Sequence, residues 1–271
     1  MSSEDKIFMS EDDDQEMLTA NHKARESFKY FWRELSWERR RIVPGLEIAS
    51  VKIIFKDNDA KDGDPSIEHM WINEVNFDGE FITGFLMNSP NWLRNISAGD
   101  HVKAKLTDVS DWMFVIEGEV YGGFTINLLR SRMSRAELNS HDEAWGLDFG
   151  NPSQINLVYV EKKKSILAKV FGSKGQVNPA EEQKALVEHP MSISMAQSLV
   201  EELKKSDDLI HSVDENGWSL LHGEALAGNA TSVKILLEHG ADRNLKTKRG
   251  ETPLELAKTL NWNNVIEILS S

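Results

Sequence analysis

The chain has 271 residues, which is enough for one or two domains that each bury a hydrophobic core. Its formal net charge of −13 argues against direct binding of nucleic acid, because phosphate backbones are bound by basic surfaces, and the absence of cysteine excludes disulfides and thiolate chemistry. No apolar run approaches the roughly 20 residues of a membrane span and the N-terminus is acidic, so we expect a cytoplasmic protein without a signal peptide.

The chain begins with an acidic tail and a long helix. We predict that residues 1–15 form a solvated tail, because Glu11 to Asp14 are consecutive acids. From Gln15 to Arg41 apolar residues recur at helical spacing and form one stripe, which consists of Ala24, Phe28, Phe31 and Leu35. The arginine run at residues 39–41 is interpreted as the end of this helix, where cations favour the C-terminal dipole, rather than as a phosphate site.

Between residues 47 and 119 the pattern changes to a period of two, which predicts β-strands. The dipeptide Asp78-Gly79 lies between two such runs and predicts a hairpin turn. We therefore expect an antiparallel, curved meander with the N-terminal helix packed on one face, followed by a helix over residues 125–139. The expected strands cover residues 51–55, 70–77, 81–87, 102–106 and 112–116.

Several short motifs in this region resemble a known group of proteins. They are Glu68-His69-Met70-Trp71, Gly84 to Pro90, Gly99-Asp100, Asp111-Trp112-Met113 and Gly122 to Thr125. Through them, residues 16–160 resemble the YegJ-like family of uncharacterised bacterial domains. The resemblance implies a domain that occurs alone or joined to ankyrin repeats. It implies no reaction, because no biochemical activity is established for that family.

The C-terminal third of the chain repeats itself. After an expected linker over residues 161–178, Asn178-Pro179 predicts a helix start, with Asn as the N-cap. Two later stretches match at an offset of 33 residues, pairing Gly217 with Gly250, Ser219 with Thr252, Leu221 with Leu254, and Leu236 with Leu269. A period of this length is typical of solenoid repeats. The pattern resembles the ankyrin repeat, with a degenerate capping repeat at residues 179–211 and repeats at residues 214–246 and 247–271.

The resemblance to ankyrin repeats assigns roles to single residues. Ser219 and Thr252 are expected to cap helices. The family's histidine, which bonds to the capping hydroxyl, is matched by His222 and replaced by Glu255 in the next repeat. Because the array is short and residues 265–269 are strongly apolar, we expect the first domain to cover part of it. Partners of ankyrin proteins contact the concave face and the finger tips, so the expected partner-binding residues are Arg243, Leu245, Lys246, Lys248, Arg249, Trp218 and Glu224.

Candidates for catalysis are few. Glu68, His69 and Asp111 are the residues that could form an acid–base pair. A structural role is the alternative, because His69 and Trp71 share one side of a strand and Asp111 can cap a turn. The adjacent residues 141–143 (His-Asp-Glu) do not converge on one metal ion without an unusual turn. Since the chain also carries no phosphate-binding glycine loop, we expect neither a metal nor a cofactor.

The sequence therefore predicts an α+β domain with an antiparallel curved sheet and packed helices, followed by a short all-α ankyrin array. The function that fits is binding of another protein, with a basic partner favoured by the charge of −13 and with no binding of nucleic acid or membrane. One specific form is an immunity or antitoxin-like protein that neutralises a basic toxin. The alternatives are an enzyme with a site near Glu68, His69 and Asp111, and a cytoplasmic scaffold without a toxin. The oligomeric state stays open.

Overall fold

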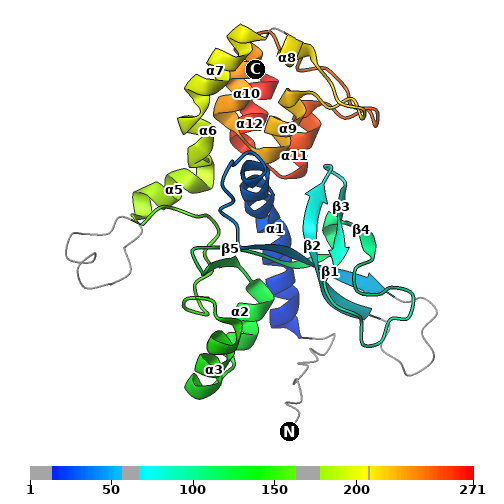
Figure 1. The fold of residues 1–271 in the computed structure, drawn as a ribbon, viewed down its shortest axis with the longest axis vertical. Coiled ribbons are helices and arrows are strands. Elements are labelled where there is room, and N and C mark those ends of the chain that lie inside the picture. The colour runs from blue at the N-terminus through cyan, green and yellow to red at the C-terminus, as the bar shows by residue number, and fades with distance from the viewer. Residues whose placement is uncertain (1–13, 57–66, 163–177, 207) are drawn as a thin grey trace.

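The computed structural model describes residues 14–56, 67–162, 178–206 and 208–271. The predicted acidic tail and linker lie mostly outside these ranges. One long helix, α1 (Gln15–Glu38), lies between an antiparallel sheet and a C-terminal array of short helices (Figure 1). The sheet has six strands in the spatial order β4-β3-β2-β1-β5-β6, namely β1 (Ile48–Lys56), β2 (Ile67–Phe77), β3 (Phe81–Leu86), β4 (His101–Lys105), β5 (Val109–Ile116) and β6 (Glu119–Gly122).

The first four strands form the predicted meander, but the fifth does not continue it. In the β2–β3 hairpin, Asp78 accepts the backbone N–H of Phe81 at 2.7 Å, and Gly79 takes a φ of 89° that favours glycine. A single 3₁₀ turn (Leu106–Asp108) follows β4, and β5 then pairs with the other side of β1. The prediction of a simple meander is wrong from this point, because alternation along a strand does not specify which neighbour the strand pairs with.

Two helices follow the sheet, α2 (Phe124–Ser131) and α3 (Arg135–Trp145). The prediction of one helix over residues 125–139 is wrong because Ser134 starts a new helix. Its N–H donates to the Glu137 carboxylate at 2.9 Å, which forms a capping box. The buried face of α2 also carries polar residues. Asn127 and Arg130 are both buried, and the Arg130 guanidinium donates to Asp142 at 2.9 Å.

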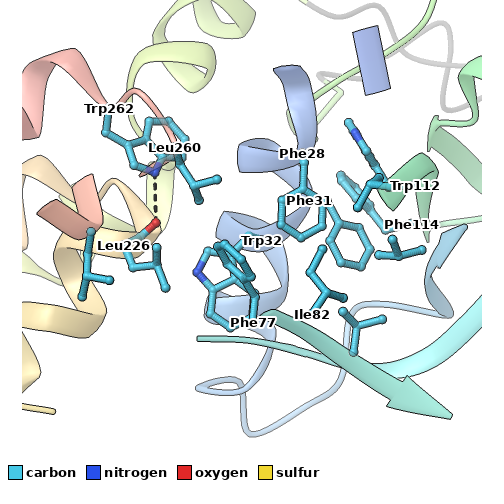
Figure 2. Packing of buried hydrophobic residues seen from close by; sticks show 14 of the residues in the cluster. Phe28, Phe31, Trp32, Phe77, Ile82, Trp112, Phe114, Leu226, Leu260 and Trp262 are labelled. Atoms are coloured by element: carbon cyan, nitrogen blue, oxygen red, sulfur yellow. Dashed lines mark hydrogen bonds between the residues drawn. The ribbon is translucent and has the colours of Figure 1, made fainter. Parts of the chain in front are cut away.

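The aromatic stripe of α1 packs on the inner face of the sheet, as predicted. Phe28 and Phe31 are fully buried and lie toward Trp112 and Phe114 of β5 (Figure 2). The ring centroids of Phe31 and Trp112 are 6.0 Å apart. The Trp112 indole N–H also donates to the Ala24 carbonyl of α1 at 2.9 Å, which fixes both the ring and the helix. This contact places α1 directly across β5.

The two faces of the sheet are covered to different extents. All eight residues of β5 are buried. Met113 and Val115 on its outer face pack against Ile126 of α2 and Phe149 after α3. Along β3 and β4, by contrast, outward side chains such as Phe85 are exposed. The outer face is therefore closed at the β5 side and open at the β4 side.

The C-terminal array consists of short helices that stack in antiparallel pairs. α6 and α7 pack on α10 as a shortened first repeat, and the pairs α9–α10 and α11–α12 correspond to the two predicted repeats. Within the described residues the helices are α5 (Pro179–Val187), α6 (Pro190–Ser194), α7 (Ala196–Lys205), α8 (Asp208–His211), α9 (Leu220–Ala227), α10 (Ala230–Glu238), α11 (Pro253–Thr259) and α12 (Asn263–Ser270).

The helix starts of the repeats show how Glu255 takes the place of a histidine. Nδ1 of His222 lies 2.8 Å from the Ser219 hydroxyl oxygen, and its Nε2 lies 3.0 Å from the Leu245 carbonyl oxygen. Burial lowers the pKa of His222, which favours the neutral ring. In the next repeat the Glu255 carboxylate accepts the Thr252 N–H at 2.7 Å. Although Glu255 departs from the family pattern, the start of α11 is therefore still capped.

Alanine substitutions at Gly118 and Gly122 distinguish two costs in the β5–β6 hairpin, the positive φ at both glycines and the close approach to Trp112 at Gly122 alone. Both glycines have a positive φ, 73° and 78°, so alanine costs each about 1–2 kcal/mol in the free energy of unfolding. A Cβ at Gly122 would lie 2.3 Å from the Trp112 carbonyl oxygen, whereas no described atom comes within 4 Å of a Cβ at Gly118. We expect urea unfolding to show a loss of about 1–2 kcal/mol for Gly118→Ala and at least about 3 kcal/mol for Gly122→Ala. Equal losses would contradict the close approach of β6 to Trp112.

Candidate functional site

A buried polar network joins the C-terminal half of α1 to the repeats. We call this region the joint and define it as residues 29–41, which are the second half of α1 and the turn after it, together with Ala185, His189, Glu224, Asn229 and Trp262. The Trp37 indole N–H donates to the Asn229 side-chain oxygen at 2.9 Å, and Asn229 donates to Glu224 at 2.8 Å. The Arg40 guanidinium lies 2.6 Å from Glu224 and 4.5 Å from the Trp37 ring centroid. Because Glu224 and Asn229 are buried, their polar atoms need partners, and α1 supplies them.

A second network in the joint surrounds Glu34. Nε2 of His189 and the guanidinium of Arg41 each lie 2.9 Å from one of its carboxylate oxygens. Burial raises the pKa of Glu34, but the hydrogen bond from His189 and the positive charge of Arg41 outweigh burial, so the pKa of Glu34 is lowered overall. Nδ1 of His189 accepts the Met191 N–H at 3.1 Å, which leaves Nε2 as the donor to Glu34. The His189 ring stacks on Trp37 with 5.6 Å between centroids, so the two networks meet.

The third contact of the joint is made by Trp262. Lys29 and Arg33 of α1 each lie 5.1 Å from its ring centroid. The Trp262 N–H donates to the Leu226 carbonyl at 3.0 Å, which holds the ring against the preceding repeat (Figure 2). Arg33 also donates to the Ala185 carbonyl, and burial lowers its pKa to about 10. The first domain thus contacts the array at Trp262, whereas the expected cover was over residues 265–269.

The β2–β3 hairpin touches the repeats as well. Arg249 donates to the Asp78 carboxylate at 2.7 Å. A Cβ at Gly79 would lie 2.6 Å from the Leu256 side chain, so the turn glycine also lets α11 approach. Together with Glu224 on α9, these contacts show that the inner helices of the array face α1 and the hairpin.

The joint and the hairpin use some of the residues expected to contact a partner. Glu224 is paired with Arg40, and Arg249 is paired with both Asp78 and Glu251. Trp218 is half-buried beside His222. Of the remaining expected residues, Lys246 and Lys248 are exposed, and Arg243 and Leu245 are half-buried. The finger tip is therefore divided between internal contacts and solvent.

Asp111, one of the three residues of the alternative enzyme site, is fully buried at the start of α2. Its carboxylate accepts the N–H groups of Phe124 and Thr125 at 2.9 and 2.8 Å and the Thr125 hydroxyl at 2.6 Å. Burial raises the pKa of Asp111, against the opposing effects of these bonds and of Lys52. The carboxylate is fully engaged in holding the helix start.

The other two residues lie apart from Asp111. Glu68 and His69 are neighbours on β2, so their side chains point to opposite faces of the sheet. Strand β1 separates β2 from β5, which carries Asp111. Glu68 accepts the Asn91 N–H at 2.9 Å and so fixes the loop after β3. The structure does not bring the three residues to one shared position.

The described residues form neither a metal-binding cluster nor a membrane-spanning helix. Across the described ranges no group of three or more Asp, Glu or His side chains is arranged to hold a metal ion. His141 and Asp142 contact each other at 2.9 Å, and Asp142 also pairs with Arg130. None of the helices in the described part of the chain combines the length and apolarity needed to cross a bilayer.

Sequence reasoning missed the joint. The run at residues 39–41 was expected only to end a helix, yet Arg39 donates to the Val75 carbonyl at 2.7 Å, while Arg40 and Arg41 bind Glu224 and Glu34. The signal that could have found it is a tryptophan, Trp37, placed beside these arginines and off the apolar stripe. Such a set points to a second buried face on α1.

Comparison with known proteins agrees with this two-part architecture. Residues 14–149 match the family described as uncharacterized protein conserved in bacteria (DUF2314), and residues 210–257 match ankyrin repeats. A protein of Neisseria meningitidis serogroup B, named for its ankyrin repeats, is 42% identical over 99% of this chain and 98% of its own length. The Escherichia coli protein YegJ is 36% identical over 23% of this chain and 40% of its own. Human ankyrin repeat domain-containing protein 29 is 50% identical over 16% of this chain and 15% of its own. Both predicted resemblances are confirmed, and the repeats suggest interaction with other proteins.

The hydrogen bond from Trp37 can be tested with a matched pair of substitutions. Trp37→Phe removes the N–H that Asn229 accepts and leaves a buried oxygen without this donor, so we expect a loss of about 1–3 kcal/mol beyond the loss of ring volume. Trp32→Phe is the control, because Trp32 is similarly buried and its Nε1 has no hydrogen-bond partner among the described residues. Urea unfolding of the full chain measures both. Equal losses would show that the Trp37 bond adds nothing to stability.

The structural role of Asp111 predicts a stability effect. Asp111→Asn places an amide group against buried N–H donors, so we expect a loss of about 2–4 kcal/mol in thermal or urea unfolding. Glu68→Gln, at a more exposed position, should cost less than about 1 kcal/mol because one oxygen still accepts the Asn91 N–H. An Asp111→Asn variant as stable as the unmodified chain would argue against this role and in favour of the enzyme alternative.

Proposed function

Because the chain belongs to the bacterial family described as DUF2314 and joins this domain to ankyrin repeats, we propose that it acts as a protein-binding module. The observation that carries the proposal is the solvent-facing part of the loop between α10 and α11, which is the second finger of the array. We call it the open finger and define it as Arg243, Lys246 and Lys248. The candidate catalytic residues, by contrast, are dispersed over the sheet.

The open finger is held in shape before any partner binds. The Lys248 N–H donates to the Asn216 carbonyl of the preceding finger at 2.8 Å, and the Thr247 N–H donates to the Glu251 carbonyl at 2.9 Å. His222 fixes the Leu245 carbonyl from the helix side. A preorganised loop loses little conformational entropy on binding. Its three cations suit carboxylates or carbonyl groups of a partner.

A more specific form of the proposal is an immunity or antitoxin-like protein that neutralises a basic toxin. The net charge of −13 supports attraction to a cationic partner. The open finger is itself basic, so such a partner would bind elsewhere. The helix pair α6–α7 fits better, because Glu201 and Glu202 are exposed there together with Ile193 and Met195, which are 58% and 42% exposed. Apolar residues rimmed by charge are typical of interaction surfaces.

Affinity capture with the tagged full chain from its native lysate, read by mass spectrometry, tests both forms of the proposal. Two charge-reversal variants are compared, Lys246→Glu with Lys248→Glu, and Glu201→Lys with Glu202→Lys. Lys23→Glu, at an exposed position on α1, is the control for charge alone. We expect a stoichiometric partner that the control retains and one of the double variants loses.

The pattern of loss distinguishes the two forms. Loss with the finger variant supports the open finger as the contact surface. Loss with the α7 variant, together with a partner of high pI, supports the basic-toxin form. A partner captured equally by all variants would contradict both surfaces. Capture of no partner at all would contradict the binding module and favour a screen for substrates.

A further inference from the structure

The outer face of β3 and β4 carries a row of aromatic and cationic side chains. The strand register places Phe85 opposite His101, Thr83 opposite Lys103 and Phe81 opposite Lys105. Their alternating neighbours, such as Ile82 and Val102, are buried on the α1 side, so this row points to the other face. We call it the open face and define it as Phe81, Phe85, His101, Lys103 and Lys105.

Side chains of β4 cover the aromatic rings of the open face. Nζ of Lys103 lies 3.6 Å from the Phe81 ring centroid, and the His101 ring meets the Phe85 ring edge-on at 5.2 Å. On the neighbouring strands, Lys52 lies 5.7 Å from the Trp71 centroid. Rings covered in this way are poor platforms for stacking nucleic acid bases. Lys103 and Lys105 stay exposed and available to anions.

The charge of this face is opposite to that of the whole chain. Among the outward positions of β3 and β4 there is no carboxylate, although the net charge of the chain is −13. Repulsion by the rest of the molecule works against a long polyanion such as nucleic acid. A short acidic segment that meets only this face experiences mostly its local positive charge, because more distant charges are screened.

β4 also has a free edge in the part of the sheet that the structure describes. The Asp100 carbonyl accepts the Leu86 N–H, whereas the Lys105 N–H turns away from β3 and donates to the Asp108 side chain at 3.0 Å. Since backbone groups alternate in direction along an antiparallel strand, those of His101 and Lys103 point to the free edge. Lysines on an edge strand discourage pairing with neutral or basic strands, but they favour an acidic one.

We propose that β4 and the open face bind an extended acidic segment of a partner protein, which adds to β4 as a further strand. Main-chain hydrogen bonds to the edge supply affinity. Acidic side chains at every second position meet His101, Lys103 and Lys105, and the alternate apolar side chains continue the inner face beside Val102 and Ala104. This inference concerns another surface than the open finger and α7, and it does not rest on the proposed function.

A model peptide tests the inference directly. The probe is a fluorescein-labelled peptide of alternating Glu and Val, titrated onto the full chain and followed by fluorescence polarisation. We expect saturable binding that Lys103→Glu weakens by at least about tenfold, whereas Lys23→Glu, the same charge change on α1, changes it by less than about twofold. A peptide with N-methyl groups on one edge of its backbone should also bind at least about tenfold more weakly, because it cannot pair with β4.

Several results would overturn the inference. These are the absence of saturable binding, equal weakening by Lys103→Glu and Lys23→Glu, and full affinity of the N-methylated peptide. Oligothymidine that binds more tightly than the peptide and is sensitive to Lys103→Glu would assign the face to nucleic acid instead. If the combined change Glu11→Gln, Asp12→Asn and Asp13→Asn in the full chain raised peptide affinity, the occupant would be the chain's own N-terminal segment rather than a partner.

Discussion

Helix α1 buries two surfaces at once, and through them it joins the sheet to the repeats. Its aromatic stripe closes the sheet through Phe31 and Trp112, while Trp37 near its C-terminal end and Arg40 just after it bind Asn229 and Glu224 of the repeats. The second contact is polar and buried, so separating the two parts would leave several groups without their partners. A solenoid usually needs three or more repeats to close its core. Here two full repeats and a shortened one are completed by a helix from outside the array.

This arrangement changes what the repeats can do. Ankyrin arrays contact partners through the concave face and the finger tips, but here the inner helices face α1 and the β2–β3 hairpin. The open finger and the outer helices are the surfaces that remain. Net charge is then a poor guide to the partner, because the chain is acidic overall while the open finger and the open face are basic. Recognition depends on the local charge of the surface that makes the contact.

The sequence predicted the features that local patterns determine. The α1 stripe, the Asp78-Gly79 turn and the capping residues Ser219 and Thr252 follow from spacing and backbone preference, and the structure confirms them. The pairing of β5 with β1 did not follow, because the continuous apolar run at residues 112–116 can be buried equally well beside any strand. The joint was missed for a related reason. An arginine at a helix end has an adequate local explanation, and Glu224 reveals its buried partner only when distant segments meet.

The most direct test of this account is whether the two parts unfold together. Hydrogen–deuterium exchange across a urea series, read by mass spectrometry, reports the unfolding of peptides from β1–β5 and from α9–α12 separately in the intact chain. If α1 unites the two parts, both sets of peptides should lose protection at the same urea concentration, and Trp37→Phe should shift both together. Loss of protection in the repeats at a clearly lower urea concentration, with the sheet still protected, would contradict the joint as the interaction on which the fold depends.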